Sequence, residues 1–182
     1  MKCLCNSDGQ FHAHGLAGWP AYIVPIPVTR SKHTPWSEHA TDYAITQACA
    51  SFAPFGLRLR YDGPRRDGVR KGWIHVEWDD LGRYWGFAQY PTGRTSSTGF
   101  PRDRLTIRLN YTVPASLRHS VILHEFGHCV GLRHLESGIM APVLRQSHAP
   151  SWRHDPARAV LEDIYEKYNH KRITKRNKRE LK

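Results

Sequence analysis

The sequence lacks the long apolar segment that a membrane-spanning helix needs. Its longest uncharged apolar run extends from Gly15 to Val28, and three prolines interrupt it. The first eight residues turn polar before an apolar signal region can form, so no secretory leader is visible. We therefore expect no membrane span, and a protein that is cytoplasmic or released without a classical leader.

Cysteine is scarce as well. The four cysteines are Cys3, Cys5, Cys49 and Cys129. They form no spaced framework, and Cys3 and Cys5 are too close in sequence for an ordinary mutual disulfide. Cys129 falls on the apolar side of a predicted helix, where we expect a small buried side chain. The cysteines leave the redox compartment open.

Internal repeats and low-complexity blocks are absent before the C-terminal tail. The 182 residues include 40% hydrophobic and 24% charged residues, a composition that excludes disordered, collagen-like and coiled-coil proteins. The length fits one globular domain with its own core. We expect an N-terminal extension over 1–20, one domain over 21–170 and a basic tail over 171–182.

Acidic residues are few, and the resulting charge is unevenly placed. The formal net charge is +11, of which the segment Lys167–Lys182 carries +7, from eight Lys or Arg and one Glu. Such a tail could contact nucleic acid, an acidic protein or an anionic lipid surface. It could equally be a solvated extension that aids solubility.

Hydrophobic periodicity predicts a sheet covered by helices. Tyr22–Val28 is rich in β-forming residues, and its two prolines suit an edge strand or an extended entry segment. A helix is predicted over Pro35–Ala53, with Thr34 as its capping residue. Four short strands and two more helices follow: Leu57–Tyr61, Trp73–Trp78, Trp85–Tyr90, Leu105–Asn110, a helix from Ser116 to Gly131, and a final helix over Asp155–Asn169.

The most informative stretch runs from His124 to His134, His-Glu-Phe-Gly-His-Cys-Val-Gly-Leu-Arg-His. Residues four apart on a helix are rotated by roughly 400°, so His124 and His128 would lie about 40° apart and could share one metal ion. Glu125 would lie on the same broad side. Its carboxylate could take a proton from metal-bound water without binding the metal.

A third nitrogen can come from His134. Gly131 permits a left-handed turn that ends the helix and brings His134 back toward the other two histidines. Three neutral imidazoles suit Zn²⁺ with one position left for water, as in catalytic sites. The ion would lower the pKa of that water from 15.7 to roughly 7 and polarise a substrate carbonyl. This chemistry predicts hydrolysis.

These residues resemble the signature of the metzincin zinc peptidases, His-Glu-x-x-His-x-x-Gly-x-x-His followed by a methionine turn. Met140 stands six residues beyond His134, and the resemblance implies that it lies beneath the three histidines as an apolar base. The implied fold is α+β and zincin-like: a twisted mixed five-stranded sheet with an antiparallel edge strand, covered by two helices, plus a C-terminal helix. The implied activity is zinc-dependent endopeptidase, with Glu125 as general base.

Within that family, Gly86–Pro91 and Glu162–Tyr165 look most like the matrixin branch. Two positions depart from the related patterns: Leu135 follows the third histidine, where matrixins have Ser and astacins have Glu, and Pro142 replaces the tyrosine of astacins and serralysins. We expect an extended substrate to add to the sheet edge at Trp85–Tyr90. The connection Ala141–Pro150 would then border the pocket after the scissile bond.

Other polar groups allow weaker hypotheses. Calcium could bind acidic residues, although a solvated strand end is the alternative; they are Glu77, Asp79 and Asp80. The remaining histidines match no second metal site. Cys3 or Cys5 could block the zinc as a thiolate, as matrixin propeptides do, but the residues around them do not match that motif.

A second class of function is a basic module that binds nucleic acid or protein and uses the metal structurally. Structural zinc has no need of Glu125, so the motif favours the peptidase. We expect a monomer acting on protein or peptide substrates.

Overall fold

The computed structural model describes residues 25–66, 70–89, 104–144, 150–163 and 165. The N-terminal extension, the basic tail, Cys3 and Cys5 therefore lie outside the described residues. The elements are β1 (Ile26–Ser31), α1 (Glu38–Ala50), η1 (Ala53–Phe55), β2 (Leu59–Arg65), β3 (Trp73–Asp79), β4 (Gly86–Ala88), β5 (Arg104–Asn110), η2 (Ala115–Leu117), α2 (Arg118–Cys129) and η3 (Trp152–His154).

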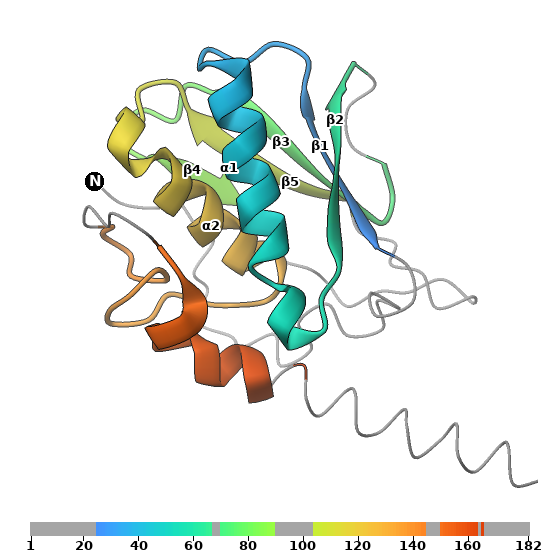
Figure 1. The fold of residues 1–182 in the computed structure, drawn as a ribbon. Coiled ribbons are helices and arrows are strands. Elements are labelled where there is room, and N and C mark those ends of the chain that lie inside the picture. Colours follow the sequence, from blue (N-terminus) through green and yellow to red (C-terminus); the bar gives the residue numbers. More distant parts are fainter. Residues whose placement is uncertain (1–24, 67–69, 90–103, 145–149, 164, 166–182) are drawn as a thin grey trace, which may run out of the picture.

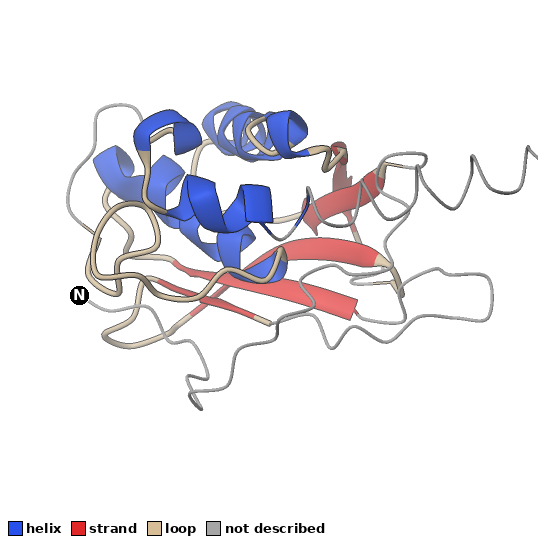
Figure 2. Cartoon of the chain, turned by 90° about the horizontal axis from the view of Figure 1, so that it is seen from below, coloured by secondary structure: helices blue, strands red, loops and turns tan. Residues whose placement is uncertain are grey.

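The five strands form one mixed sheet with the order β2-β1-β3-β5-β4. All neighbouring pairs are parallel except β4 and β5, which are antiparallel, so the short strand β4 forms an antiparallel edge. Figure 1 shows α1 and α2 crossing this sheet, and Figure 2 shows the helices gathered on one side of it. The prediction of a five-stranded mixed sheet covered by helices is confirmed.

The alternation of side chains along the strands builds the core. The side chains of Val28, Ile74 and Leu105 lie in register on three adjacent strands, and each is at most 1% exposed. On α2, every residue from Ser120 to Cys129 is buried. Cys129 is therefore in the core, as its position on the helix predicted.

The first strand differs from its prediction. It is an interior strand that pairs with both β2 and β3, and not a strand at the sheet edge. Pro27 is tolerated because the N–H of Ile26 faces β2, so position 27 faces the side of β3, where pairing begins only at Val28. The edge strand next to β1 is β2, which continues past its predicted end at Tyr61. The pairing of β1 with β2 shifts register there, and Gly63, with φ of 82°, allows the irregular backbone that this shift requires.

The helix α1 begins three residues later than predicted. Its N-cap is Ser37, whose side chain accepts a hydrogen bond from the backbone of Ala40, and not Thr34. Proline at position 35 is thus outside the helix. The Thr34 hydroxyl instead accepts from the backbone N–H of Trp36, a local bond that competes with helix formation.

The last helical segment is described over residues 157–163 and at Tyr165. Its predicted stripe includes Ile164 and Tyr168, which lie outside the described residues. The Tyr165 hydroxyl donates to the carbonyl of Val130, and the Trp152 indole donates to Ser51 after α1. These bonds tie the C-terminal segment to the ends of both long helices. None of the helices in the described part of the chain is long and apolar enough to cross a membrane.

Candidate metal centre

The helix α2 ends in the turn that the sequence predicted. Gly131 has a left-handed φ of 99°. Its N–H bonds the carbonyl of His128, and the N–H of Leu132 bonds the carbonyl of Gly127 at 2.8 Å. This pair of bonds is a Schellman motif, which closes the helix and reverses the chain. The reversal carries the following residues back along α2, toward His124 and His128.

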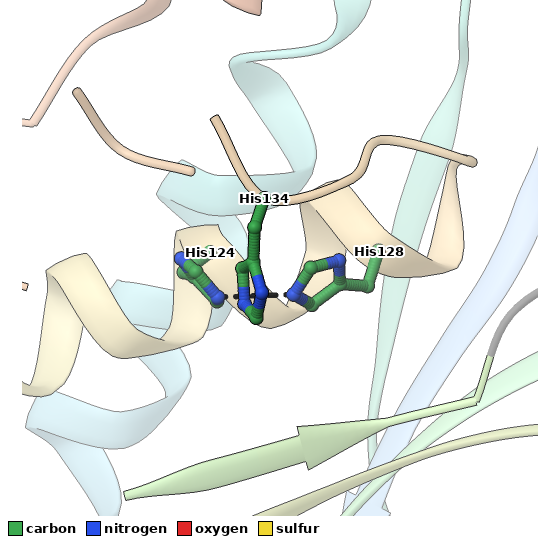
Figure 3. A group of neighbouring side chains, drawn as sticks. All are labelled: His124, His128 and His134. Carbon is green, nitrogen blue, oxygen red and sulfur yellow. Dashed lines mark hydrogen bonds between the residues drawn. The ribbon is translucent and has the colours of Figure 1, made fainter. Parts of the chain in front are cut away.

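The three predicted histidines converge (Figure 3). His124 and His128 are fully buried, His134 is partly exposed, and one ring nitrogen from each lies within 4.8 Å of the others. The two Nε2 atoms of His124 and His128 are 3.0 Å apart. Nitrogen ligands of one tetrahedral zinc ion, each about 2.05 Å from it, are about 3.3 Å apart. The spacing matches a shared ion.

Backbone carbonyls fix which nitrogen of each buried ring faces the cluster. The Nδ1 of His124 lies 2.6 Å from the carbonyl oxygen of Ile139, and the Nδ1 of His128 lies 2.8 Å from that of Leu132. A carbonyl can only accept, so each Nδ1 carries the proton and donates it. Each neutral ring then turns the lone pair of Nε2 toward the cluster, as metal-ligating histidines do.

Burial keeps these rings neutral. It lowers the pKa of His124 to about 4, since the bond to Ile139 only partly opposes it and His134 lowers it further. Burial also brings the pKa of His128 well below its usual value, with His124 contributing, and it lowers the pKa of His134. Neutral imidazole is the form that binds metals.

The chemistry of the three histidine nitrogens fits a cation. Two Nε2 lone pairs that face each other at 3.0 Å repel unless a positive centre lies between them, and the neutral rings have no second proton to supply. The Nε2 of His134 is buried and has no hydrogen-bond partner in the described part of the chain. Three imidazole nitrogens that lie close together fit a borderline metal such as Zn²⁺.

Glu125 follows the first histidine on α2 and lies against the sheet edge. It is 1% exposed, and its carboxylate lies against Gly86, the first residue of β4. A Cβ at position 86 would overlap the Oε1, Cδ and Cγ atoms of Glu125. Only glycine leaves room for that carboxylate. Within the described ranges, the group of potential metal ligands contains the three histidines and not Glu125.

Met140 packs against α2. It is fully buried, and its Sδ and Cε lie so close to Gly127 of α2 that a Cβ at position 127 would overlap the sulfur. The turn that carries Met140 is held by Asp155, whose Oδ2 accepts from the backbone N–H of Ile139 at 2.6 Å. The carbonyl of Ile139 in turn accepts from His124, so Asp155 supports a candidate ligand through one residue.

The other residues singled out in the sequence have different roles. Arg108 pairs with Glu77 at 2.9 Å and with Asp79 at 3.8 Å, while Asp80 accepts from the backbone of Gly82. In the described ranges these acids do not form a candidate metal group. His75 is buried within the sheet and His154 is exposed; His12, His14 and His148 lie outside the described residues.

Sequence reasoning missed the residues that position the histidines. Leu132 and Ile139 act through their backbone carbonyls and Asp155 through its carboxylate, while Gly86 leaves room for Glu125. A carbonyl carries no signal in the residue type, and the contact between Gly86 and Glu125 joins positions 39 apart in the chain. Asp155 carried a detectable signal as an acidic residue just before a predicted helix.

Comparisons with known proteins support the fold. Models of known protein families give no match, and neither do the curated proteins. Among solved structures, metalloproteinase-II from Bacteroides fragilis matches with a TM-score of 0.52 and 11% identity, over 79% of this chain and 54% of that one.

Two other matches are weaker in TM-score. Myroilysin matches with a TM-score of 0.44 and 15% identity, over 73% of this chain and 54% of that one. Another match is high choriolytic enzyme 1, a hatching enzyme zinc-protease from the medaka fish Oryzias latipes. Its TM-score is 0.37 and its sequence identity 19%, over 74% of this chain and 54% of that one. The chain thus spans about half the length of these proteins. Its structural neighbours are metalloproteases, and it carries a histidine triad that could bind metal.

Proposed function

We propose that the protein is a zinc-dependent endopeptidase of the metzincin type, with His124, His128 and His134 as metal ligands. The observation that carries this proposal is the convergence of one ring nitrogen from each of the three histidines, on a helix that also carries the buried Glu125. The neighbouring fold of metalloproteinase-II supports it. A purely structural zinc site closes its fourth position with a fourth protein ligand, and no such ligand joins the triad among the described residues.

A bound zinc ion would supply Lewis acidity toward water and toward the peptide carbonyl. The protein's own residues do the rest. Glu125 acts as general base: its carboxylate accepts the proton of the attacking water and passes it to the leaving amine. The carbonyls of Ile139 and Leu132 hold the two helix histidines in the tautomer that binds metal. Met140 supplies an apolar floor.

The substrate is proposed to bind as an extended strand along β4. This strand is only three residues long, lies at the sheet edge and pairs with β5 on one side. Its other side offers backbone groups to a peptide, which would read backbone more than sequence. Because Gly86 contacts Glu125, a peptide paired there would have its scissile bond beside the general base.

The finer assignments rest on the sequence motifs. Gly86–Pro91 and the C-terminal Glu162–Tyr165 favour a matrixin-like enzyme, in which residues 21–170 form the catalytic domain. We propose protein or peptide substrates and a monomeric enzyme, with the basic tail over 171–182 free to contact an acidic surface. Met140 serves as the methionine turn.

The decisive experiment compares wild type with Glu125→Ala on a peptide library, read by mass spectrometry. Zinc-loaded wild type should cut internal bonds, and Glu125→Ala should bind zinc equally but lose turnover by about 10²–10⁴-fold, the usual contribution of a general base. Wild-type protein that holds one zinc yet cuts no peptide or denatured protein would disprove the proposal. Loss of function on deleting 171–182, with Glu125→Ala silent, would favour a nucleic-acid-binding or protein-binding module.

A further inference from the structure

A cavity of about 820 Å³ shares the turn at Ile139 with the histidine cluster. The turn from Glu136 to Ile139 lines it, together with Ser151 and with Asp155, which is hydrogen-bonded to that turn. The carbonyl of Ile139 accepts from His124, so this turn also supports the candidate metal centre. The cavity is large enough for a long side chain.

The register of β4 places this cavity on one side of the scissile bond. Gly86 pairs with Leu109, and after β5 the chain passes through η2 directly into α2, so the first turn of α2 stands at the end where β4 begins. Ser120, one turn before His124, lines the cavity. A peptide antiparallel to β4 runs toward this same end with its C-terminal half. The cavity therefore faces the residue that follows the scissile bond.

The lining combines apolar walls with negative charge. Pro142, Val143 and Leu144 give the cavity an apolar side. Glu136 and Asp155 add two carboxylates, and His154 is the one basic side chain among the described lining residues. A long side chain with an apolar stem and a cationic head complements such a surface, since the stem covers the apolar wall and the head reaches the acids.

A buried hydroxyl gives independent evidence for a polar occupant. Ser120 is only 3% exposed, and its Oγ has no hydrogen-bond partner in the described part of the chain. A buried polar atom without a partner is costly, and a donor entering the cavity would remove that cost. An ammonium or guanidinium group is such a donor.

We infer that this enzyme selects a lysine or arginine immediately after the scissile bond, with Glu136, Asp155 and Ser120 as the residues that determine this specificity. The inference rests on the proposed peptidase function. Asp155 has both oxygens occupied by backbone N–H groups, of Ile139 and Ala157, so it is fixed in place. Glu136 is exposed at the rim and can be changed without breaking a described contact.

The test uses full-length zinc-loaded protein and peptides that differ only in the residue after the mapped cleavage site: lysine, norleucine or glutamate. Lysine and norleucine share the apolar stem, so their ratio of kcat/KM isolates the charge. The assays are run at pH 8, where the lysine side chain of the peptide is charged. Wild type should prefer lysine over norleucine by about fivefold, and over glutamate by more, as expected for partly exposed charge pairs.

The variants separate this specificity from stability and metal binding. Glu136→Gln should lower the lysine-to-norleucine ratio about threefold, and Glu136→Lys should bring it below one. The matched control Glu38→Gln makes the same charge change on α1, which does not line the cavity, and should leave the ratio unchanged. Ser120→Ala should also lower the ratio, because it removes the buried acceptor. Zinc content and thermal melting are measured for each variant.

Binding gives a readout without turnover. Fluorescence anisotropy of the same labelled peptides on zinc-loaded Glu125→Ala should show tighter binding of the lysine peptide by a similar factor. Cleavage with equal or reversed preference, or a lysine preference that Glu136→Lys leaves unchanged, would overturn the inference while leaving the peptidase function standing. Failure of the zinc-loaded wild type to cleave any peptide would remove the proposed function and this inference with it.

Discussion

Two polar clusters in this protein differ in whether their own groups satisfy one another. The first joins β1, α1 and β2: Arg30, 1% exposed, donates to Asp42 at 2.6 Å, and the hydroxyl of Tyr61 donates to the same carboxylate at 2.5 Å. Its positive and negative groups satisfy each other. The second cluster is the histidine triad, in which three acceptor nitrogens face one another.

The pKa values reflect this difference. Burial alone would raise the pKa of Asp42, but the hydrogen bonds from Arg30 and Tyr61 outweigh burial and lower it. In the triad, burial lowers the pKa of each histidine. A closed cluster stabilises the fold, whereas a cluster of acceptors could hold a cation. The comparison separates structural polar groups from functional ones.

His75 is a buried histidine whose two ring nitrogens both face hydroxyl groups, unlike those of the triad. Its Nδ1 lies 2.9 Å from the hydroxyl of Thr29, and its Nε2 lies 3.4 Å from the hydroxyl of Ser31. Hydroxyls can donate or accept, so either tautomer is satisfied. Burial alone therefore does not mark a metal ligand; the groups facing both nitrogens do.

The largest expected effect comes from replacing a histidine of the triad by alanine. His128→Ala should abolish zinc binding and reduce turnover to background, because it removes a ligand. His75→Ala, the matched control, should keep zinc and turnover and lose about 1–3 kcal/mol of unfolding free energy, since Thr29 remains buried without its partner. Zinc is measured by atomic emission and stability by urea unfolding. Zinc bound normally by His128→Ala would contradict the assignment of the triad.

A smaller effect is expected at the sheet edge. Gly86→Ala would place a methyl group where the Glu125 carboxylate lies, so the carboxylate must move. We expect kcat/KM to fall about 10–100-fold with zinc content unchanged, a part of what a general base contributes. Ala88→Gly, on the same strand, controls for changes in β4. Unaltered kcat/KM in Gly86→Ala would separate Glu125 from the reaction.

Removing the metal should lower the thermal stability of the wild type but not that of a variant that lacks a triad histidine. Zinc at about 100 times its Kd stabilises the folded state by about 2.7 kcal/mol, so chelation should lower the wild-type Tm by about 5–10 °C. The same chelator should leave the Tm of His128→Ala unchanged. Differential scanning calorimetry measures both. An equal shift in both proteins would place the metal elsewhere.

The smallest effect is expected in the closed cluster. Asp42→Asn should cost about 1–2 kcal/mol, a value at the low end for a buried pair because Asp42 is 37% exposed. Its folded-state pKa is lowered from 3.8, so its contribution is present above that value and is lost as pH falls toward the folded pKa. Urea unfolding at pH 7 and pH 3 should show the difference between the two proteins shrinking, with zinc content and turnover at pH 7 unchanged.

The sequence by itself determined the order of the elements, the single face shared by His124 and His128, and the turn at Gly131, because these follow from local periodicity and backbone freedom. It placed α1 early because Thr34 and Ser37 are both capping residue types, and the side chain that follows Pro35, Trp36, is held by a bond to the distant carbonyl of Tyr111. It predicted an edge strand or an extended entry segment where β1 is an interior strand, since pairing partners are set by contacts distant in the chain.

Only the tertiary structure decided what surrounds the site. The carbonyls of Leu132 and Ile139 that orient the rings, the overlap of Gly86 with Glu125, and the cavity beside Ser120 all join segments far apart along the chain or use atoms common to every residue. Local pattern fixes which side chains can meet, because helix and strand geometry is periodic. Which atoms face them depends on how separate elements pack.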